Sequence, residues 1–511
     1  MKGVVSAGSI PTAETGARIL ADGGNAIDAA VGACMAVAAG EPTLTSLAGG
    51  GMMILHLAKT NQTIIHDFFG DAPKLKQSEV DDLDFYPIEL DYGPTTQRFY
   101  VGRGAAGVPG VLPGLCSALD HWGTMPLRDV IAPACRLLRH GAVIGAGQAA
   151  LAEFLEPILT ETEAGRDIFA PDGNYISEGS TFKLPRLADT LEQLANTGWR
   201  DYYNGPFREL VLAHFGPDAG GLITPSDFDG YSVERRTPLQ VDAGGGTLFT
   251  VPLPAAGGPM IALMRTLFAS SVGQNKSSRY RRLCAAMATA DEARLGGFLT
   301  TEQTSLERSL DIYRQKLDGH LYAASQPGGP PSTTHVSVVD ADGNAVGVTF
   351  SHGESNGRVI PGTGIMMNNF LGEEDLLPQG LGTAPPGQRL ATMMSPTILR
   401  TDEGGVFVLG TGGSNRIRTA ILQVINALLD DKMSPSEAVQ SPRLHFEAGK
   451  LTAEVFGRHA TVPFTDLDVR EFVSFEKPHM FFGGVNLAAR LPNGEFAGGA
   501  DTRRSGHCIV V

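Results

Sequence analysis

The stretch GGPPSTTHVSVVDADGNAVGVTFS (residues 328–351) joins a Gly/Pro-rich segment to a predicted β-hairpin. Valines alternate on both sides of Asp342-Gly343, a pair that is typical of a two-residue turn between antiparallel strands. Such a turn would place Thr334 opposite Ser351, with Thr333 within one residue of that register. Two threonines therefore stand where turn-forming residues meet a predicted core strand.

A threonine hydroxyl is a weak nucleophile unless a base lies beside it. One solution places threonine at the start of a chain, where its own α-amine serves as that base. Thr333 would reach this state if the Ser332–Thr333 bond broke, and the preceding GGPPS suits a cleavage loop. The local pattern leaves a simpler interpretation open, in which both threonines are ordinary β-prone residues at the start of a strand.

The composition excludes some classes of function. The chain has 511 residues, 42% hydrophobic and 19% charged residues and a net charge of −15, which disfavours a nucleic-acid partner. The longest apolar stretch, AIDAAVGACMAVAAG (26–40), contains Asp28 and is too short to span a membrane, so we expect a buried helix capped by Asn25. The first residues lack the pattern of a secretory signal, and we expect a cytoplasmic protein with no membrane partner.

The order of predicted elements indicates an α+β protein with layered sheets and helices on the outside. Helical patterns cover 126–215 and 259–318, and a pair of strands lies between them at 237–258. After the break at 325–332, strands are predicted at 335–351, 359–367, 397–400 and 406–411, and a helix at 418–430. The five cysteines lack zinc-ligand spacing, and no motif indicates a metal or another cofactor.

Eight blocks follow one another in the order seen in one enzyme family. The chain resembles the γ-glutamyltransferases (glutathione hydrolases) in GGNAIDAAVGACMAVAAGEPTLTSLAGGG (23–51), AAGVPGVLPGL (105–115), WGTMPLRDVIAPACRLLRHG (122–141), GGLITPSDFDGY (220–231), TTHVSVVDADGNAV (333–346), MSPTI (394–398), GTGGSNRI (410–417) and GGADTRRSG (498–506). The resemblance implies an N-terminal-nucleophile (Ntn) hydrolase fold, an αββα four-layer sandwich formed as one catalytic domain by two subunits.

The resemblance also implies the subunit boundaries and the catalytic residues. Self-cleavage between Ser332 and Thr333 would give a large subunit, 1–332, with mostly helical outer layers plus strands. The small subunit, 333–511, would supply central sheets and the nucleophile. The two would form a heterodimer, and further pairing of heterodimers stays open. The implied catalytic set comprises the nucleophile Thr333, the assisting hydroxyls of Thr349 and Ser351, and an oxyanion-stabilising pair, Gly412 and Gly413. An ordinary glycine turn before a helix is the alternative for that pair.

Several positions that bind the γ-glutamyl group in the family carry other residues here. Phe69, in DFFGDAP (67–73), stands where the resemblance places the arginine that holds the substrate α-carboxylate. Each lost charge-assisted hydrogen bond is worth about 1.5–3 kcal/mol, which would weaken γ-glutamyl binding about ten- to a hundredfold. The predicted substrate-binding positions, all altered from the family pattern, are Phe69, Phe370, Glu373, Thr392 and Met393, and Gly353 replaces a carboxylate-binding asparagine.

The sequence therefore favours a self-cleaving amidohydrolase or acyltransferase that acts on a small-molecule amide through a Thr333 acyl-enzyme. We expect the acyl group to differ from γ-glutamyl. Three alternatives remain: a true γ-glutamyltransferase, a small-acid amidase such as an oxamate amidohydrolase, and an uncut binding protein. The first requires a rearranged set of binding residues, and the second requires a carboxylate-binding arginine near Thr333. Arg98, Arg103, Arg358 and Arg389 are candidates for binding a carboxylate.

Overall fold

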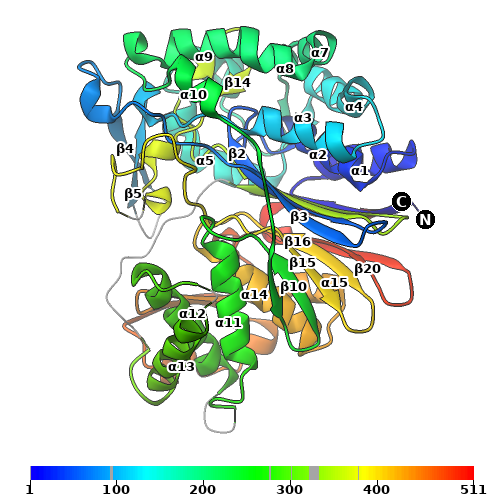
Figure 1. Ribbon diagram of the computed structural model, residues 1–511, viewed down its shortest axis with the longest axis vertical. Coiled ribbons are helices and arrows are strands. Elements are labelled where there is room, and N and C mark those ends of the chain that lie inside the picture. The colour runs from blue at the N-terminus through cyan, green and yellow to red at the C-terminus, as the bar shows by residue number, and fades with distance from the viewer. Residues whose placement is uncertain (1, 92–95, 275–277, 301, 322–332, 378) are drawn as a thin grey trace.

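Two antiparallel sheets lie face to face at the centre of the protein (Figure 1). The computed structural model describes residues 2–91, 96–274, 278–300, 302–321, 333–377 and 379–511. The seven-stranded sheet has the order β22 (His507–Val510), β1 (Gly3–Ala7), β11 (Thr334–Asp340), β12 (Ala345–Ser351), β2 (Gly50–Leu57), β3 (Gln62–Phe68) and β8 (Glu234–Arg236). The six-stranded sheet has the order β21 (Phe496–Ala500), β20 (Asn486–Arg490), β16 (Val406–Gly410), β15 (Thr397–Thr401), β10 (Gly246–Thr250) and β9 (Leu239–Asp242).

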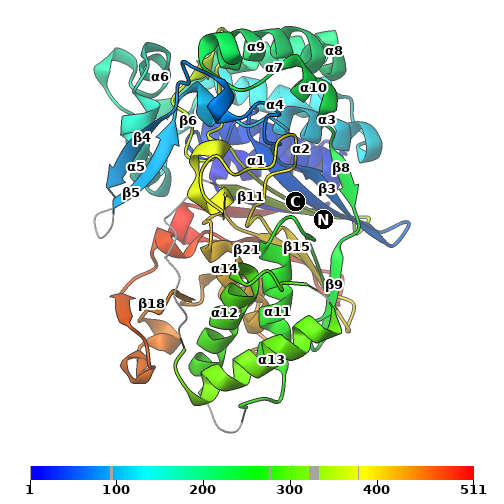
Figure 2. The ribbon, with the colours of Figure 1, turned by 60° about the vertical axis from the view of Figure 1, so that its left-hand side comes forward.

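Helices cover the outer face of each sheet. The seven-stranded sheet carries a layer formed by α1 (Ile10–Ala21), α2 (Ala26–Gly40), α3 (Val111–Trp122), α4 (Leu127–His140), α5 (Ala146–Leu159), α6 (Glu163–Phe169), α7 (Pro185–Thr197), α8 (Trp199–Tyr202), α9 (Arg208–Phe215) and α10 (Pro225–Gly230). The six-stranded sheet carries α11 (Gly257–Ala269), α12 (Arg279–Leu295), α13 (Gln303–Asp318), α14 (Arg416–Leu429) and α15 (Pro435–Gln440). Figure 2 shows α11, α12 and α13 at the opposite end of the molecule from α7, α8 and α9.

Smaller sheets extend the two halves. They pair β4 (Tyr86–Asp91) with β5 (Thr96–Val101), β6 (Ala142–Val143) with β7 (Thr181–Phe182), β13 (Val359–Ile360) with β14 (Ile365–Met366), and β17 (Leu444–Glu447), β18 (Lys450–Glu454) and β19 (Glu471–Phe475) with one another. In the part of the chain that the structure describes, no helix has the length and apolar character needed to cross a lipid bilayer.

Three apolar cores separate the four layers. One lies between α1–α10 and the seven-stranded sheet, a second between α11–α15 and the six-stranded sheet, and a third between the two sheets. Alternation along the strands explains how one sheet serves two cores. Val336 and Val338 of β11 belong to the first core, whereas Val339 belongs to the inter-sheet core. This αββα arrangement confirms the predicted α+β Ntn-hydrolase fold.

The β11–β12 hairpin differs from the predicted turn. Asp340 donates its N–H to the Asn344 carbonyl at 3.0 Å, so three residues, not two, form the loop. Gly343 adopts φ +87°, the left-handed conformation that closes a three-residue loop. The register consequently pairs Thr334 with Phe350 rather than with Ser351, and His335 with Thr349. One step further along this register, Thr333 comes beside Ser351.

Candidate active site

A pocket opens where the start of β11 meets the end of β12, with about 410 Å³ of space between the atoms, part of which is open to solvent. Its lining combines hydroxyl, carboxylate, aromatic and thioether side chains from six separate stretches of the chain. The lining residues are Phe69, Thr333, Ser351, Gly353, Phe370, Glu373, Asp375, Leu376, Thr392, Met393, Met394, Ser414 and Ile417. All five predicted substrate-binding residues therefore lie in one pocket with Thr333 and Ser351.

Strand alternation separates the two threonines of the TTH block. Thr334 lies on the α-helical side of β11, where its hydroxyl donates to the buried Glu41 carboxylate at the end of α2. Thr333 lies on the inter-sheet side, lines the pocket and is 6% exposed. Glu41 also accepts from the Thr12 hydroxyl at 3.0 Å, and burial raises the pKa of this carboxyl. Glu41 was not predicted from the sequence, because it reaches Thr334 only through the tertiary fold.

Thr349 is adjacent to the pocket but does not line it. Its hydroxyl lies 2.7 Å from His335 Nδ1, while His335 Nε2 lies 2.8 Å from the Ser337 hydroxyl. Burial lowers the pKa of His335 to about 3, so this ring is neutral near pH 7. Ser337 donates its hydroxyl proton to the Asn486 carbonyl, so its oxygen must accept a hydrogen bond from the Nε2–H of His335. The Nδ1 atom of this neutral ring then carries no proton and accepts a hydrogen bond from the Thr349 hydroxyl. The Thr349 oxygen keeps capacity to accept another hydrogen bond.

Gly412 and Gly413 lie between β16 and the start of α14, and the backbone of Gly412 approaches that of Thr333. A Cβ on Gly412 would lie 1.9 Å from the Thr333 carbonyl oxygen and 2.7 Å from its carbon, so only glycine fits. Gly413 has φ +131°, which side chains rarely adopt. Backbone N–H groups before a helix N-terminus suit a developing negative charge. Gly412 therefore lies beside the nucleophile candidate, Gly413 follows it in the chain, and neither glycine lines the pocket.

Ser351, Gly353 and Glu373 form one tightly packed side of the pocket. The Ser351 hydroxyl accepts the Gly353 N–H at 2.9 Å, and Gly353 has φ +70°. A Cβ at position 353 would lie 2.2 Å from Glu373 Oε1, so an asparagine here would collide with that carboxylate. Glu373 accepts the Glu354 N–H at 2.8 Å. Burial, followed by the nearby Glu354 charge, raises the pKa of Glu373 well above its usual range.

Two stacked aromatic rings form the apolar side of the pocket. The Phe69 and Phe370 rings have centroids 4.8 Å apart and planes inclined by 29°. Each side chain is 1% exposed. Phe69 follows β3 directly, and Phe370 begins a short turn, η6 (Phe370–Gly372). Among the described residues that line the pocket, none is a lysine or an arginine.

The four arginines considered as carboxylate binders are engaged elsewhere. Their guanidinium groups pair with acidic side chains, and none of them lines the pocket. The pairs are Arg98 with Glu89 at 2.8 Å, Arg103 with Asp84 at 2.9 Å, Arg358 with Glu161 at 3.0 Å, and Arg389 with Asp71 at 2.7 Å.

Two polar lining residues were missed by the sequence analysis. The Ser414 hydroxyl donates to Asp375, and burial raises the pKa of that carboxyl. Ser414 follows the glycine pair directly, so GTGGSNRI was the available signal for it, whereas Asp375 lies in a Pro/Gly-rich stretch with no distinct pattern. Ser332, the predicted residue before the cleavage point, lies outside the described residues.

Comparisons with known proteins agree on one family. The family model described as Gamma-glutamyltranspeptidase matches residues 12–511. The Glutathione hydrolase proenzyme of Escherichia coli (strain K12) is 30% identical over 478 residues, covering 87% of this chain and 81% of the relative. The Acylase ACY 1 proenzyme of Pseudomonas sp. (strain SE83) is 30% identical over 522 residues, which cover 97% of this chain and 91% of the relative.

A solved structure shows the same fold. The structure of cephalosporin acylase from Bacillus halodurans superposes with a TM-score of 0.82 at 23% identity, covering 99% of this chain and 95% of the other. At this identity the likeness concerns the fold alone, and it extends over all four layers described above.

Proposed function

Because this chain belongs to the gamma-glutamyltranspeptidase family of N-terminal-nucleophile enzymes, we propose that it cuts itself before Thr333 and then hydrolyses or transfers an uncharged acyl group. The observation that carries the acyl assignment is the Phe69–Phe370 stack at the position where the resemblance places a carboxylate-binding arginine. Pairing of the four candidate arginines with other carboxylates supports the same conclusion.

Self-cleavage begins with attack of the Thr333 hydroxyl on the carbonyl of residue 332. The peptide nitrogen leaves as the Thr333 α-amine, and the acyl chain moves to the threonine oxygen as an ester. Water hydrolyses the ester, which frees both the hydroxyl and the α-amine. The inter-sheet orientation of Thr333, on the same face as Thr349 and Ser351, supports this residue over Thr334.

Turnover uses the same hydroxyl. The α-amine accepts the hydroxyl proton while the oxygen attacks the substrate carbonyl, and the N–H groups of Gly412 and Gly413 stabilise the resulting oxyanion. The α-ammonium then protonates the leaving amine as the C–N bond breaks. Water or an acceptor amine releases the acyl group from Thr333. The close approach of Gly412 to the Thr333 carbonyl supports this arrangement.

The acyl pocket favours a neutral aliphatic or aromatic group. Phe69, Phe370 and Met393 offer apolar surface, and Glu373 and Asp375 would repel a carboxylate whenever they are ionised. A γ-glutamyl group would lose an ionic partner worth about 1.5–3 kcal/mol. The raised pKa of Glu373 lets this side chain donate a hydrogen bond to a neutral polar atom.

The two products of cleavage would stay together as a heterodimer. The β11–β12 hairpin of segment 333–511 lies between β1 and β2 of segment 1–332, with ladder hydrogen bonds on both sides. Separating the subunits would therefore open the middle of a seven-stranded sheet. Native mass spectrometry tests this assembly and any pairing of two heterodimers.

A panel of p-nitroanilides tests the acyl assignment. Hexanoyl and phenylacetyl anilides should exceed γ-glutamyl and glutaryl anilides in kcat/KM by at least about tenfold, the factor expected for one lost charge-assisted bond. A preference for γ-glutamyl would instead establish a true γ-glutamyltransferase, and turnover of oxamate would establish a small-acid amidase. An uncut, inactive chain would leave the binding-protein alternative. Thr333→Ala is the control for turnover by this site.

A further inference from the structure

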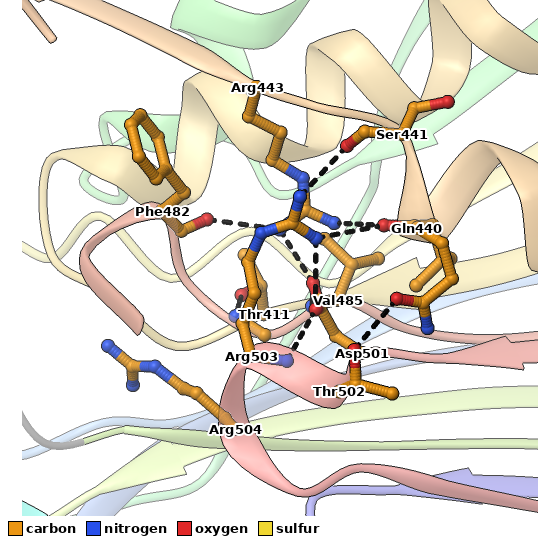
Figure 3. Close-up of polar contacts among 12 residues, drawn as sticks. Thr411, Gln440, Ser441, Arg443, Phe482, Val485, Asp501, Thr502, Arg503 and Arg504 are labelled. Carbon is orange, nitrogen blue, oxygen red and sulfur yellow. Dashed lines mark hydrogen bonds and ion pairs between the residues drawn. The ribbon is translucent and has the colours of Figure 1, made fainter. Parts of the chain in front are cut away.

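A buried charge network joins Asp501 and Arg503, from the C-terminal GGADTRRSG block that the proposed reaction does not use, to Arg443 and Glu454. Figure 3 shows Arg443, Asp501 and Arg503. Arg443 Nη1 lies 2.6 Å from Asp501 Oδ2, and Arg503 lies 3.1 Å from the other Asp501 oxygen. Arg503 also lies 2.6 Å from Glu454 Oε2. These four side chains are at most 2% exposed, and their charges balance. Buried ion pairs add little net stability, so a network of this kind suggests a positional role.

The network holds the backbone of one loop. Arg443 donates to the Phe482 carbonyl at 3.1 Å, and Asp501 accepts the Val485 N–H at 3.1 Å. Glu454 accepts the His479 N–H at 2.9 Å. Charged groups therefore fix residues 479–485 at both ends. Figure 3 shows Phe482 and Val485 on either side of the Arg443 guanidinium.

That loop contacts the glycine pair through Thr411. The buried Thr411 hydroxyl accepts the Gly484 N–H at 2.8 Å and donates to the Gly412 carbonyl at 2.7 Å. The loop also fits closely, because a Cβ on Gly483 would lie 2.7 Å from the Gly412 oxygen. Thr411 is thus the link between the charge network and the backbone beside Thr333.

The contact with the Gly412 carbonyl has a geometric consequence. A trans peptide is planar, so the C=O of Gly412 and the N–H of Gly413 belong to one rigid unit and point in opposite directions. A hydrogen bond that fixes the Gly412 oxygen therefore fixes the direction of the Gly413 N–H.

We propose that Thr411, held by residues 479–485 and their charge network, is a positioning residue that aims the Gly413 N–H at the reaction oxyanion. The inference rests on the proposed role of Gly412 and Gly413. Thr411 lines no part of the acyl pocket and acts through the Gly412 peptide. It should affect the rate of the chemical step more than substrate binding.

Thr411→Val and Thr411→Ser separate this role from simple packing. Valine keeps the shape of the side chain and removes the hydroxyl. We expect kcat to fall about ten- to a hundredfold, because a small misalignment of a catalytic hydrogen-bond donor slows the chemical step, while KM should change less than about twofold. Serine keeps the hydroxyl and should restore kcat to within about threefold of wild type. Inhibition by phenylboronic acid, which forms a tetrahedral anion on the nucleophile, should weaken in the valine variant by a factor similar to the loss in kcat.

The matched control is Thr289→Val in α12. Thr289 is also fully buried, and its hydroxyl donates to one carbonyl, that of Ala285, at 2.8 Å. This variant should keep kcat and lose less thermal stability than Thr411→Val, which also leaves the Gly484 N–H without its acceptor. Any of three results would overturn the inference. They are a kcat in Thr411→Val equal to that of the wild type, a loss of kcat that Thr411→Ser does not restore, and an inhibition constant for phenylboronic acid that the valine substitution leaves unchanged.

The test is independent of the acyl preference. Every variant is assayed with whichever anilide the wild type turns over fastest, so failure of the acyl assignment leaves the ratios between variants intact. Wild-type turnover by Thr333→Ala would instead refute the proposed nucleophile.

Discussion

Gly412→Ala should inactivate the enzyme through the position of Thr333. The added Cβ would lie 1.9 Å from the Thr333 carbonyl oxygen, whereas ordinary contacts begin at 3.4 Å, a shortfall of 1.5 Å. The two closest atoms of Thr333, its carbonyl oxygen and carbon, are backbone atoms just before β11, so a side-chain rotation cannot relieve the overlap. Either the strand end or the glycine segment must move by about 1 Å, a displacement that typically costs about 10²-fold in rate.

The assay combines folding, cleavage and turnover. Overpacking of this kind destabilises a protein by about 1–3 kcal/mol, so thermal denaturation gives the folded fraction to which rates are normalised. We expect kcat to fall at least about 10²-fold, with slowed or absent self-cleavage. Gly205→Ala is the matched control, because a Cβ there meets no atom within 4 Å. A Gly412→Ala enzyme that cuts itself and turns over within about threefold of wild type would refute the close approach on which the oxyanion assignment depends.

Three further substitutions test the pocket and its surroundings. Phe69→Arg breaks the aromatic stack and adds a cation, so kcat/KM for γ-glutamyl anilide should rise about tenfold relative to that for hexanoyl anilide. If steady-state kinetics give the same ratio of the two kcat/KM values as in the wild type, the role assigned to position 69 is contradicted. Arg389→Met removes the cation that lies 3.2 Å from Asp67 and 2.7 Å from Asp71. It should lower the free energy of unfolding in urea by about 3–5 kcal/mol without changing the acyl preference. A loss of kcat/KM with glutaryl anilide alone would show that Arg389 binds substrate. Burial lowers the pKa of His335 from 6.5 to about 3, so between these pH values the unfolded chain binds a proton that the folded chain does not, and stability falls as the pH drops through this window. A His335→Asn variant should therefore lose less stability than wild type between pH 6.5 and 4, and an identical acid dependence would refute the buried neutral ring.

The sequence predicted the layered fold well because the relevant signals are local and ordered. The apolar stretch 26–40 forms α2 with Asn25 as its cap, as the capping pattern indicated. The hairpin register was wrong by one residue. An Asp-Gly pair suits both a two-residue turn and the left-handed end of a three-residue loop. Which of the two forms depends on other contacts, such as the hydrogen bond that the Asp340 carboxylate accepts from the Asn344 N–H at 2.9 Å.

The position of some candidate residues could be predicted where one residue type replaces another within a recognisable block, as for Phe69 in DFFGDAP. Phe69, Phe370 and Met393 all line the pocket, and their role in substrate binding stays a prediction. Long-range partners were not predictable. Glu41 contacts Thr334 across 293 positions in the chain, and no local pattern marks that contact. The engagement of Arg389 likewise depends on acidic partners brought together by the fold.

The central claim is that Thr333 becomes a chain terminus and acts as the nucleophile. Intact mass spectrometry of the purified protein beside a Thr333→Ala variant tests this most directly. We expect the 511-residue sequence to give two chains, 1–332 and 333–511, in the wild type and a single chain in the variant. A wild-type protein that stays uncut after prolonged incubation, or a Thr333→Ala variant that is cut at the same bond, would contradict it.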